Sequence, residues 1–145
     1  MKALVTIAAA LLALAACGRS GEELDVLPAP AVRLAAIPGR PAAGYLALLI
    51  HGDRGALVSV TSPQAARIEM HETMSAATMT SMRPLARIPV HDGDTLTFSP
   101  GGQHLMLFGL APSVRPGTRI DLILHFERGQ AERLTAAVEA AGGPA

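Results

Sequence analysis

The stretch RIDLILHFE, residues 119–127, alternates apolar and polar side chains along its length. Successive side chains of a β-strand point to opposite faces, so a period of two predicts a strand with one buried face. The predicted buried face carries Ile120, Leu122, Leu124 and Phe126. The other face carries mainly charged or polar groups. This stretch, within a predicted strand over 118–127, therefore indicates a protein built from half-buried strands.

The rest of the chain shows the same organisation of short apolar runs separated by Gly, Pro and Asp, which favour tight turns. Further strands are predicted at Val32–Ile37, Tyr45–His51, Ala56–Thr61, Ala66–Glu72, Leu85–Val90, Thr95–Ser99, His104–Leu110 and Arg133–Glu139. Many short strands at regular spacing predict an all-β fold, an antiparallel sandwich or barrel. The Ala-rich end, residues 129–143, also has helical propensity. A closing strand after a hairpin at residues 128–129 is the preferred interpretation.

The N-terminus has the pattern of an export signal. Lys2 precedes an apolar segment, residues 3–16, which is too short to span a bilayer. The segment ends in LAAC at residues 14–17, which resembles the lipobox of bacterial lipoproteins. We expect a signal peptide at 1–16, a lipid-anchored tether at 17–30 beginning with lipidated Cys17, and a domain at 31–142. The protein is then a periplasmic, membrane-anchored lipoprotein. The alternative is an ordinary secretory signal in which the cysteine is coincidental.

Composition excludes several classes of function. The 145 residues hold 12 basic and 12 acidic side chains, with one Tyr, three Phe and no Trp. Nucleic-acid binding is not expected, because there is neither a basic patch nor a set of aromatic stacking platforms. No Ser-His-Asp or Cys-His arrangement and no pair of catalytic carboxylates stands out, so we do not expect an enzyme.

Histidine and methionine are concentrated between residues 70 and 106. Strand alternation puts Met70 in the core and turns His71 outward beside Glu69, while His104 and Met106 share the face opposite two buried leucines. Thioether sulfur is a soft, neutral ligand that selects Cu(I), and imidazole accepts copper in either oxidation state. A set of thioethers and imidazoles therefore predicts a copper(I) site.

The alternative for each of these residues is structural. Methionine commonly fills gaps in a core, and a solitary outward histidine is usually solvated. On this basis Met74 and Met79 are assigned to the surface of a flexible loop, Thr73–Ser81, that leads to Met82. The other histidines are assigned structural or exposed positions: His51, His91 and His125. A His-x-Met on the polar face of a strand is harder to explain by packing.

The spacing His71-x10-Met82-x21-His104-x-Met106 is similar to the signature of the PCuAC family of periplasmic copper(I) chaperones. The surrounding text resembles that family as well, in EMHE at 69–72, MRPL at 82–85 and PGGQHLMLFGL at 100–110. The similarity runs from about residue 43 to residue 126. It implies a cupredoxin-like Greek-key β-sandwich that binds Cu(I) through these four residues.

The resemblance also implies a function. Family members are associated with copper delivery toward the dinuclear copper site of cytochrome oxidase, often alongside Sco-type thiol proteins. Two departures lie outside the four ligands. HGD at 51–53 stands where an Asn-rich turn is common, and the His/Met-rich tail that supplies some members with a Cu(II) site is missing.

The sequence thus predicts a monomeric metallochaperone that is tethered to a membrane and passes copper to an oxidase copper subunit or a Sco-type thiol protein. Two alternatives remain at this point. One is an envelope protein that sequesters copper and confers tolerance. The other is a β-sandwich interaction module whose histidines and methionines bind no metal. Because Met82 follows the predicted loop, copper binding is expected to order that loop on an already folded domain.

Overall fold

Residues 24–142 are described by a computed structural model, and they form ten strands. The strands are β1 (Asp25–Arg33), β2 (Ala42–Leu49), β3 (Ala56–Thr61), β4 (Ala65–Ala76), β5 (Met79–Leu85), β6 (Ile88–Pro89), β7 (Thr95–Phe98), β8 (Gln103–Leu110), β9 (Arg119–Phe126) and β10 (Glu132–Glu139). Within these residues there is no helix, and hence no helical segment long and apolar enough to span a membrane. The predicted all-β class is confirmed.

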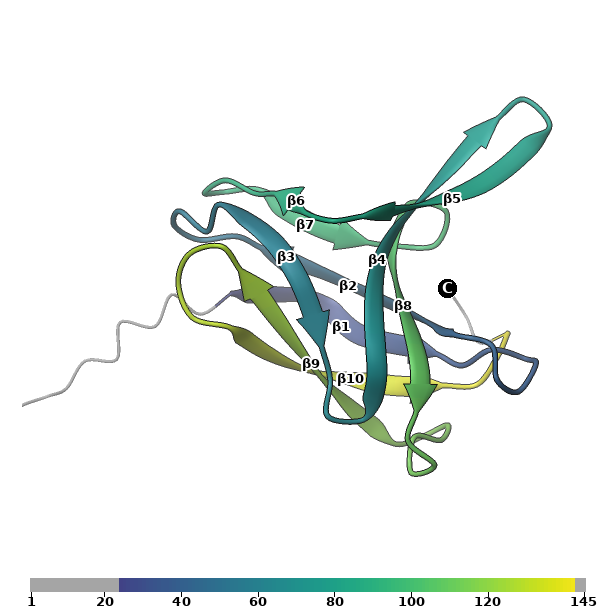
Figure 1. Ribbon diagram of the computed structural model, residues 1–145. Coiled ribbons are helices and arrows are strands. Elements are labelled where there is room, and N and C mark those ends of the chain that lie inside the picture. The colour runs from purple at the N-terminus through teal and green to yellow at the C-terminus, as the bar shows by residue number, and fades with distance from the viewer. Residues whose placement is uncertain (1–23, 143–145) are drawn as a thin grey trace, which may run out of the picture.

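The strands form one hydrogen-bonded path in the order β5-β4-β8-β2-β1-β10-β9-β3-β6, and β7 pairs with β2 beside β8. The path curls back on itself, so that β3 and β4 lie against each other although they are far apart in strand order (Figure 1). The strands pair antiparallel except for β1 and β10, which run parallel with Ala31 opposite Ala137. This parallel pair joins the first described strand to the last and closes the sandwich.

The core lies between the two layers of the curled sheet. The stretch at 119–127 behaves as its period predicts, because the four side chains of the predicted buried face are each at most 8% exposed. Burying each such side chain contributes about 1.5–3 kcal/mol of transfer free energy. The largest fully buried side chains come from both layers: Phe98, Leu48, Ile50, Leu57, Leu105, Leu107, Ile120, Leu122, Leu124 and Val32.

The C-terminal strand is also confirmed. β10 pairs antiparallel with β9 and parallel with β1, and Ala136 and Val138 point into the core. Helical propensity in this Ala-rich segment is overridden, since strand pairing on both edges satisfies the backbone while alternate small side chains pack inward.

The start of the domain differs from the prediction. β1 begins at Asp25, so residues 25–30 of the predicted tether belong to the sheet, and the domain begins before residue 31. The register with β2 shifts between Leu27 and Ala31. This irregularity accommodates Pro28 and Pro30, which lack the N–H group needed for regular pairing. The predicted signal peptide at 1–16, Cys17 and the tether through residue 23 lie outside the described residues.

The segment predicted as a flexible loop, Thr73–Ser81, is instead a β-hairpin. β4 continues to Ala76 and β5 begins at Met79, with Ala76 opposite Met79 and a tight turn at residues 77–78. The hairpin projects beyond the body of the sandwich (Figure 1). Because neither of its faces packs on the core, its sequence lacks the apolar alternation that identifies a half-buried strand. The predicted strand Leu85–Val90 is likewise divided, between the end of β5 and β6.

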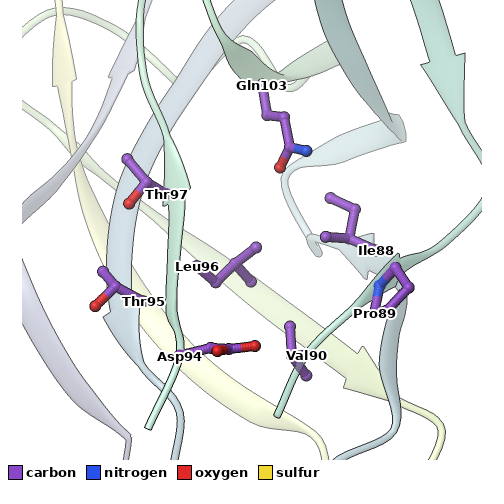
Figure 2. Close-up of a pocket in the computed structure, with 8 residues that line it drawn as sticks. All are labelled: Ile88, Pro89, Val90, Asp94, Thr95, Leu96, Thr97 and Gln103. Carbon is purple, nitrogen blue, oxygen red and sulfur yellow. The ribbon is translucent and has the colours of Figure 1, made fainter.

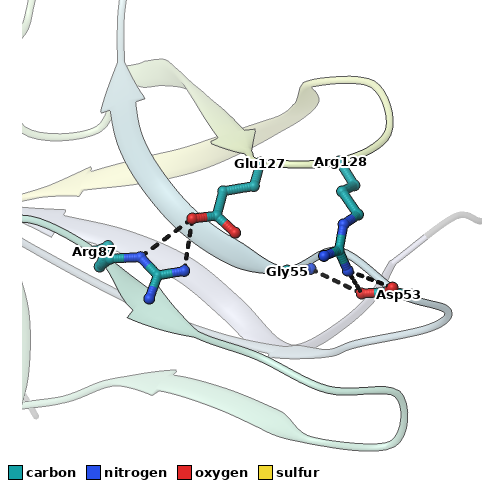
Figure 3. A network of polar contacts seen from close by, with 5 residues as sticks. All are labelled: Asp53, Gly55, Arg87, Glu127 and Arg128. Carbon is teal, nitrogen blue, oxygen red and sulfur yellow. Dashed lines mark hydrogen bonds and ion pairs between the residues drawn. The ribbon is translucent and has the colours of Figure 1, made fainter.

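Polar contacts tie together the loops at the ends of β3 and β9 (Figure 3). The Arg87 guanidinium donates to Glu127 Oε1 at 2.6 and 3.2 Å, and Arg128 donates to both carboxylate oxygens of Asp53. The Gly55 N–H donates to Asp53 Oδ1 at 3.2 Å. The hydrogen bond from Arg128 is the main reason that the pKa of Asp53 is lowered from its ordinary value.

Arg54 is the buried member of this region. It is 4% exposed, its Nη2 donates to Glu132 Oε1 at 2.8 Å, and its guanidinium carbon lies 5.6 Å from the centre of the Phe126 ring. A buried guanidinium needs a charged partner and hydrogen bonds to offset its desolvation. Glu132 supplies the charge and links β10 to the loop before β3.

Candidate metal centre

The two predicted histidine ligands lie opposite each other on neighbouring strands. His71 of β4 pairs with His104 of β8, and directly opposite residues of an antiparallel pair point to the same face. The centres of the two imidazole rings are 6.1 Å apart, with the ring planes tilted by 31°. The two imidazoles therefore border one space on the outer face of the sheet.

The two predicted methionine ligands lie on that same face. Met82 of β5 is opposite Thr73, which follows His71 by two residues along β4. Met106 follows His104 by two residues along β8, and residues two apart on a strand share a face. The structure therefore brings all four predicted ligand residues to one face of three adjacent strands, β5, β4 and β8.

A pocket of about 290 Å³ opens at this place. Three of the four residues line it: Met82, His104 and Met106. Its remaining walls are Thr73, the loop between β7 and β8, and the start of β2, namely Pro41, Ala42, Ala43, Tyr45, Pro100 and Gly101. The pocket lies where β2 changes partners, since its N-terminal half pairs with β8 and its C-terminal half with β7.

Hydrogen bonds leave one nitrogen of each imidazole available to a ligand. The Nε2 of His71 lies 2.9 Å from Glu69 Oε2, and the Nδ1 of His104 lies 3.1 Å from the carbonyl oxygen of Gly102. With the proton on these nitrogens, the lone pairs reside on Nδ1 of His71 and Nε2 of His104. Outer partners of this kind orient metal-ligating histidines.

The remaining nitrogen of His71 supports the same conclusion. Its Nδ1 is buried and has no hydrogen-bond partner within residues 24–142. A buried polar atom without a partner costs about 1–3 kcal/mol, which a metal–nitrogen bond would offset. The donor set of two imidazole nitrogens and two thioether sulfurs thus fits a soft metal ion.

Glu69 holds the first imidazole in place. The hydrogen bond from His71 is the largest reason that the pKa of Glu69 is lowered from its ordinary value, and the cation of Arg67, at 2.8 Å, lowers it further. Glu69 is therefore ionised at neutral pH and accepts the Nε2 proton of His71. Its position two residues before His71 was visible in the sequence.

The four residues differ in how open they are to solvent. His104 is 8% exposed and Met106 is partly covered, whereas Met82 is 59% exposed at the base of the projecting hairpin. The His71 side chain lies on the outer face, as predicted, but only 14% of it is exposed. The prediction that Met70 packs in the core is confirmed, because it is 5% exposed.

The three histidines assigned to structural or exposed positions lie in other contacts. His51 is 3.2 Å from Asp25, His91 is 3.1 Å from Asp94, and His125 is 2.8 Å from the hydroxyl of Thr61. None of them lines the pocket beside Met82. Within residues 24–142, no group of three or more His, Cys, Asp or Glu side chains is placed to share a metal ion.

A second hollow of similar size lies between β6 and β7 (Figure 2). It is lined by Ile88, Pro89, Val90, Asp94, Thr95, Leu96, Thr97 and Gln103. Asp94 is the charged group among them, and it accepts hydrogen bonds from the backbone and ring of His91. Neither thioether nor imidazole groups line this hollow, so it lacks the soft ligands of the candidate site.

Some walls of the site were not predicted from the sequence. Tyr45, Pro100 and Gly101 reach the pocket through the packing of β2 and the β7–β8 loop. Gly44, beside Tyr45, allows β2 to approach β8 closely, because a Cβ there would lie 3.0 Å from the Cβ of Leu105. The family resemblance that begins at about residue 43 was the sequence signal for the β2 part of this wall.

Comparison with known proteins places the chain in a family. Residues 26–138 match the model of the family described as "Putative lipoprotein LpqE-like". A relative from Leifsonia xyli subsp. xyli, named "Putative lipoprotein Lxx21020", is 38% identical over 76 residues. That match covers 50% of this chain and 45% of the relative, so it spans less than half of the relative's length.

Solved structures share the fold. The copper-bound PCuAC domain from PmoF2 is 22% identical with a TM-score of 0.62, covering 80% of this chain and 98% of that one. Apo-DR1885 from Deinococcus radiodurans is 22% identical with a TM-score of 0.60, covering 100% and 97%. Its Cu(I) form is matched at 29% identity and a TM-score of 0.52, covering 79% and 80%.

These likenesses confirm the predicted cupredoxin-like β-sandwich. The family match extends from the first described strand to the last, and the sandwich that it covers is the one found in PCuAC domains. The chain belongs to the LpqE-like family, and it shares the fold of PCuAC domains.

Proposed function

We propose that this protein is a Cu(I)-binding metallochaperone whose cargo is held by His71, Met82, His104 and Met106. The observation that carries the proposal is the convergence of these four side chains on one face of β5, β4 and β8. Two thioethers and two neutral imidazoles form a soft ligand set without charge, which suits a monovalent soft ion better than Zn(II).

The neighbours support copper as the cargo. The PmoF2 domain is copper-bound, and DR1885 has a Cu(I) form to which this chain is 29% identical. The chain's own residues support it independently, because Nδ1 of His71 is buried without a hydrogen-bond partner among the described residues, and the two imidazole rings lie 6.1 Å apart.

Exposure of the site favours transfer over permanent storage. Met82 is 59% exposed and comes from the edge strand of a projecting hairpin, so its sulfur is the ligand that an incoming group reaches first. A thiolate of an acceptor displaces this neutral ligand, and the ion then passes by stepwise exchange. The proposed acceptor is a Sco-type thiol protein or the dinuclear copper subunit of cytochrome oxidase. This chain is proposed to act on it as a monomer.

Metal titration tests the cargo. Under anaerobic conditions, the purified protein is expected to bind one Cu(I) tightly, measured by competition with a chromophoric Cu(I) chelator. Zn(II) is expected to compete weakly, because thioether sulfur is a poor ligand for that ion. Equal competition by Zn(II) would remove the case for a copper chaperone. Unchanged chelator absorbance would instead favour an interaction module that binds no metal.

The proposed location is the periplasmic face of a membrane, reached through a lipid on Cys17. Support comes from the lipobox-like LAAC at 14–17 and from the lipoprotein descriptions of the family and its relative. Cys17→Ser is expected to remove the acyl anchor and shift the protein from the membrane to the soluble envelope fraction, measured by fractionation and immunoblot. Equal membrane retention of the variant would contradict lipidation.

A further inference from the structure

The β4–β5 hairpin carries two methionines on the face opposite to the candidate copper site. Met74 is opposite Ser81, and Met79 is opposite Ala76. Because residues two apart share a face, Met74 lies on the face of Ala76 and therefore on that of Met79. Met82, opposite Thr73, lies on the other face. The hairpin thus presents thioethers on both sides.

Met74 and Met79 are diagonal neighbours across the two strands. Diagonal positions in an antiparallel pair are about 7–8 Å apart at the backbone, and long side chains close that gap. The right-handed twist of a two-stranded ribbon determines which diagonal pairs converge. In this hairpin Met74, on the first strand, is farther from the turn, and Met79, on the second strand, is nearer to it. Methionine has three rotatable bonds, so the two side chains are long and flexible enough for both sulfurs to reach a common point above the face.

Packing does not explain these two side chains. Met74 is 46% exposed and Met79 is 73% exposed, and the hairpin projects away from the core (Figure 1). Nearby positions on the hairpin carry hydroxyl groups, including those of Ser75, Thr80 and Ser81. Isolated exposed apolar residues are common. Two adjacent thioethers on one face of a polar, solvent-exposed tip form a pair of soft ligands.

We propose that Met74 and Met79 form a second, weaker site for a soft monovalent metal ion at the hairpin tip. The pair lacks imidazole ligands, so it binds more weakly and exchanges faster than the four-residue site. Met79 and Met82 are three residues apart on β5, which corresponds to about 10 Å along the strand. The proposal that copper first binds this pair and then moves to Met82 rests on the proposed function. Metal binding at the pair itself does not depend on it.

Silver(I) titration followed by NMR of methionine ε-methyl groups tests the pair, because Ag(I) is a soft monovalent ion without redox chemistry under these conditions. The full chain carrying Met82→Leu and Met106→Leu removes the thioethers of the first site. In this background the methyl signals of Met74 and Met79 are expected to shift together and to saturate at one ion per chain.

A third substitution shows whether the two sulfurs act as a unit. Adding Met74→Leu is expected to weaken the Ag(I) response of Met79 by ~10-fold or more, since one thioether is left to bind alone. Met70→Leu in the same background is the matched control, because Met70 is buried on β4. It should leave the paired response unchanged. The proposal would be overturned if the Ag(I)-induced shift of the Met79 methyl signal were the same with and without Met74→Leu. It would also be overturned if neither methyl signal shifted.

Titration of the unsubstituted chain separates this proposal from the copper function. If Met82 and Met106 do not respond to Ag(I) while Met74 and Met79 do, the four-residue site fails and the tip site stands. The opposite pattern, with responses confined to Met82 and Met106, removes the tip site and leaves the proposed function intact.

Discussion

Met82→Leu and Met106→Leu are each expected to weaken Cu(I) binding by ~10-fold or more, and the double substitution to weaken it by ~100-fold or more, if each lost sulfur removes one soft ligand. Leucine keeps the volume and apolarity of methionine, so the cost in folding stability is expected to stay below about 1.5 kcal/mol. The affinity is measured by anaerobic chelator competition, and the stability by urea unfolding of the apo form.

Met70→Leu is the matched control for this pair. It makes the same chemical change on β4, but on the face that packs into the core, where Met70 is 5% exposed and opposite Leu85. Its Cu(I) affinity should equal that of the unsubstituted chain. If Met70→Leu and Met106→Leu lower the affinity equally, the effect comes from altered packing, and the assignment of Met106 as a ligand is wrong.

Glu132→Gln is expected to lower the free energy of unfolding by about 3 kcal/mol, near the lower end of the range for breaking one side of a buried ion pair. The substitution removes the Glu132 carboxylate, which lies 2.8 Å from the Arg54 guanidinium, a group that is 4% exposed. The carbonyl oxygens of His51 and Gln130 remain as acceptors, at 3.5 and 3.4 Å. Urea unfolding monitored by circular dichroism measures the change.

Glu127→Gln is the control for burial. It breaks the ion pair with Arg87, whose side chain is 53% exposed (Figure 3), and such surface pairs contribute about 0–1 kcal/mol. Both substitutions replace a carboxylate by an amide at the same end of the sandwich. Equal losses for the two variants would mean that burial of Arg54 does not determine the energetics of this region.

Local periodicity identified the parts of the fold that pack on the core. In β9 the buried residues alternate strictly, and the strand lies where the sequence predicted it. The predicted strand Ala56–Thr61 coincides with β3. Periodicity did not identify the hairpin at 73–81, which does not pack on the core. A strand with two solvated faces has no alternation of apolar and polar residues.

The same distinction applies to the candidate site. Alternation within β8 showed that His104 and Met106 share a face, since two residues apart on one strand is a local relation. It could not place His71 opposite His104, because the register between β4 and β8 is set by the packing of strands that are separated in the chain. The only sequence evidence that joined His71 to His104 was the similarity of their spacing to the PCuAC signature, and that similarity gives no geometry.

By itself, then, the sequence determined the all-β class and the buried face of β9, because these depend on residue type and on the two-residue period of a strand. It also supplied the residue types of the candidate ligand set, two thioethers and two imidazoles, whose role as ligands stays a proposal. Only the tertiary structure decided that residues 25–30 enter the sheet and that residues 73–81 form a hairpin. It also decided that Nδ1 of His71 is buried without a protein partner in the described part of the chain. The entry of residues 25–30 into the sheet and the burial of His71 arise from contacts between separate strands, which leave no periodic signal in either strand alone. The hairpin is a local pairing, and it left no signal because neither of its faces packs on the core.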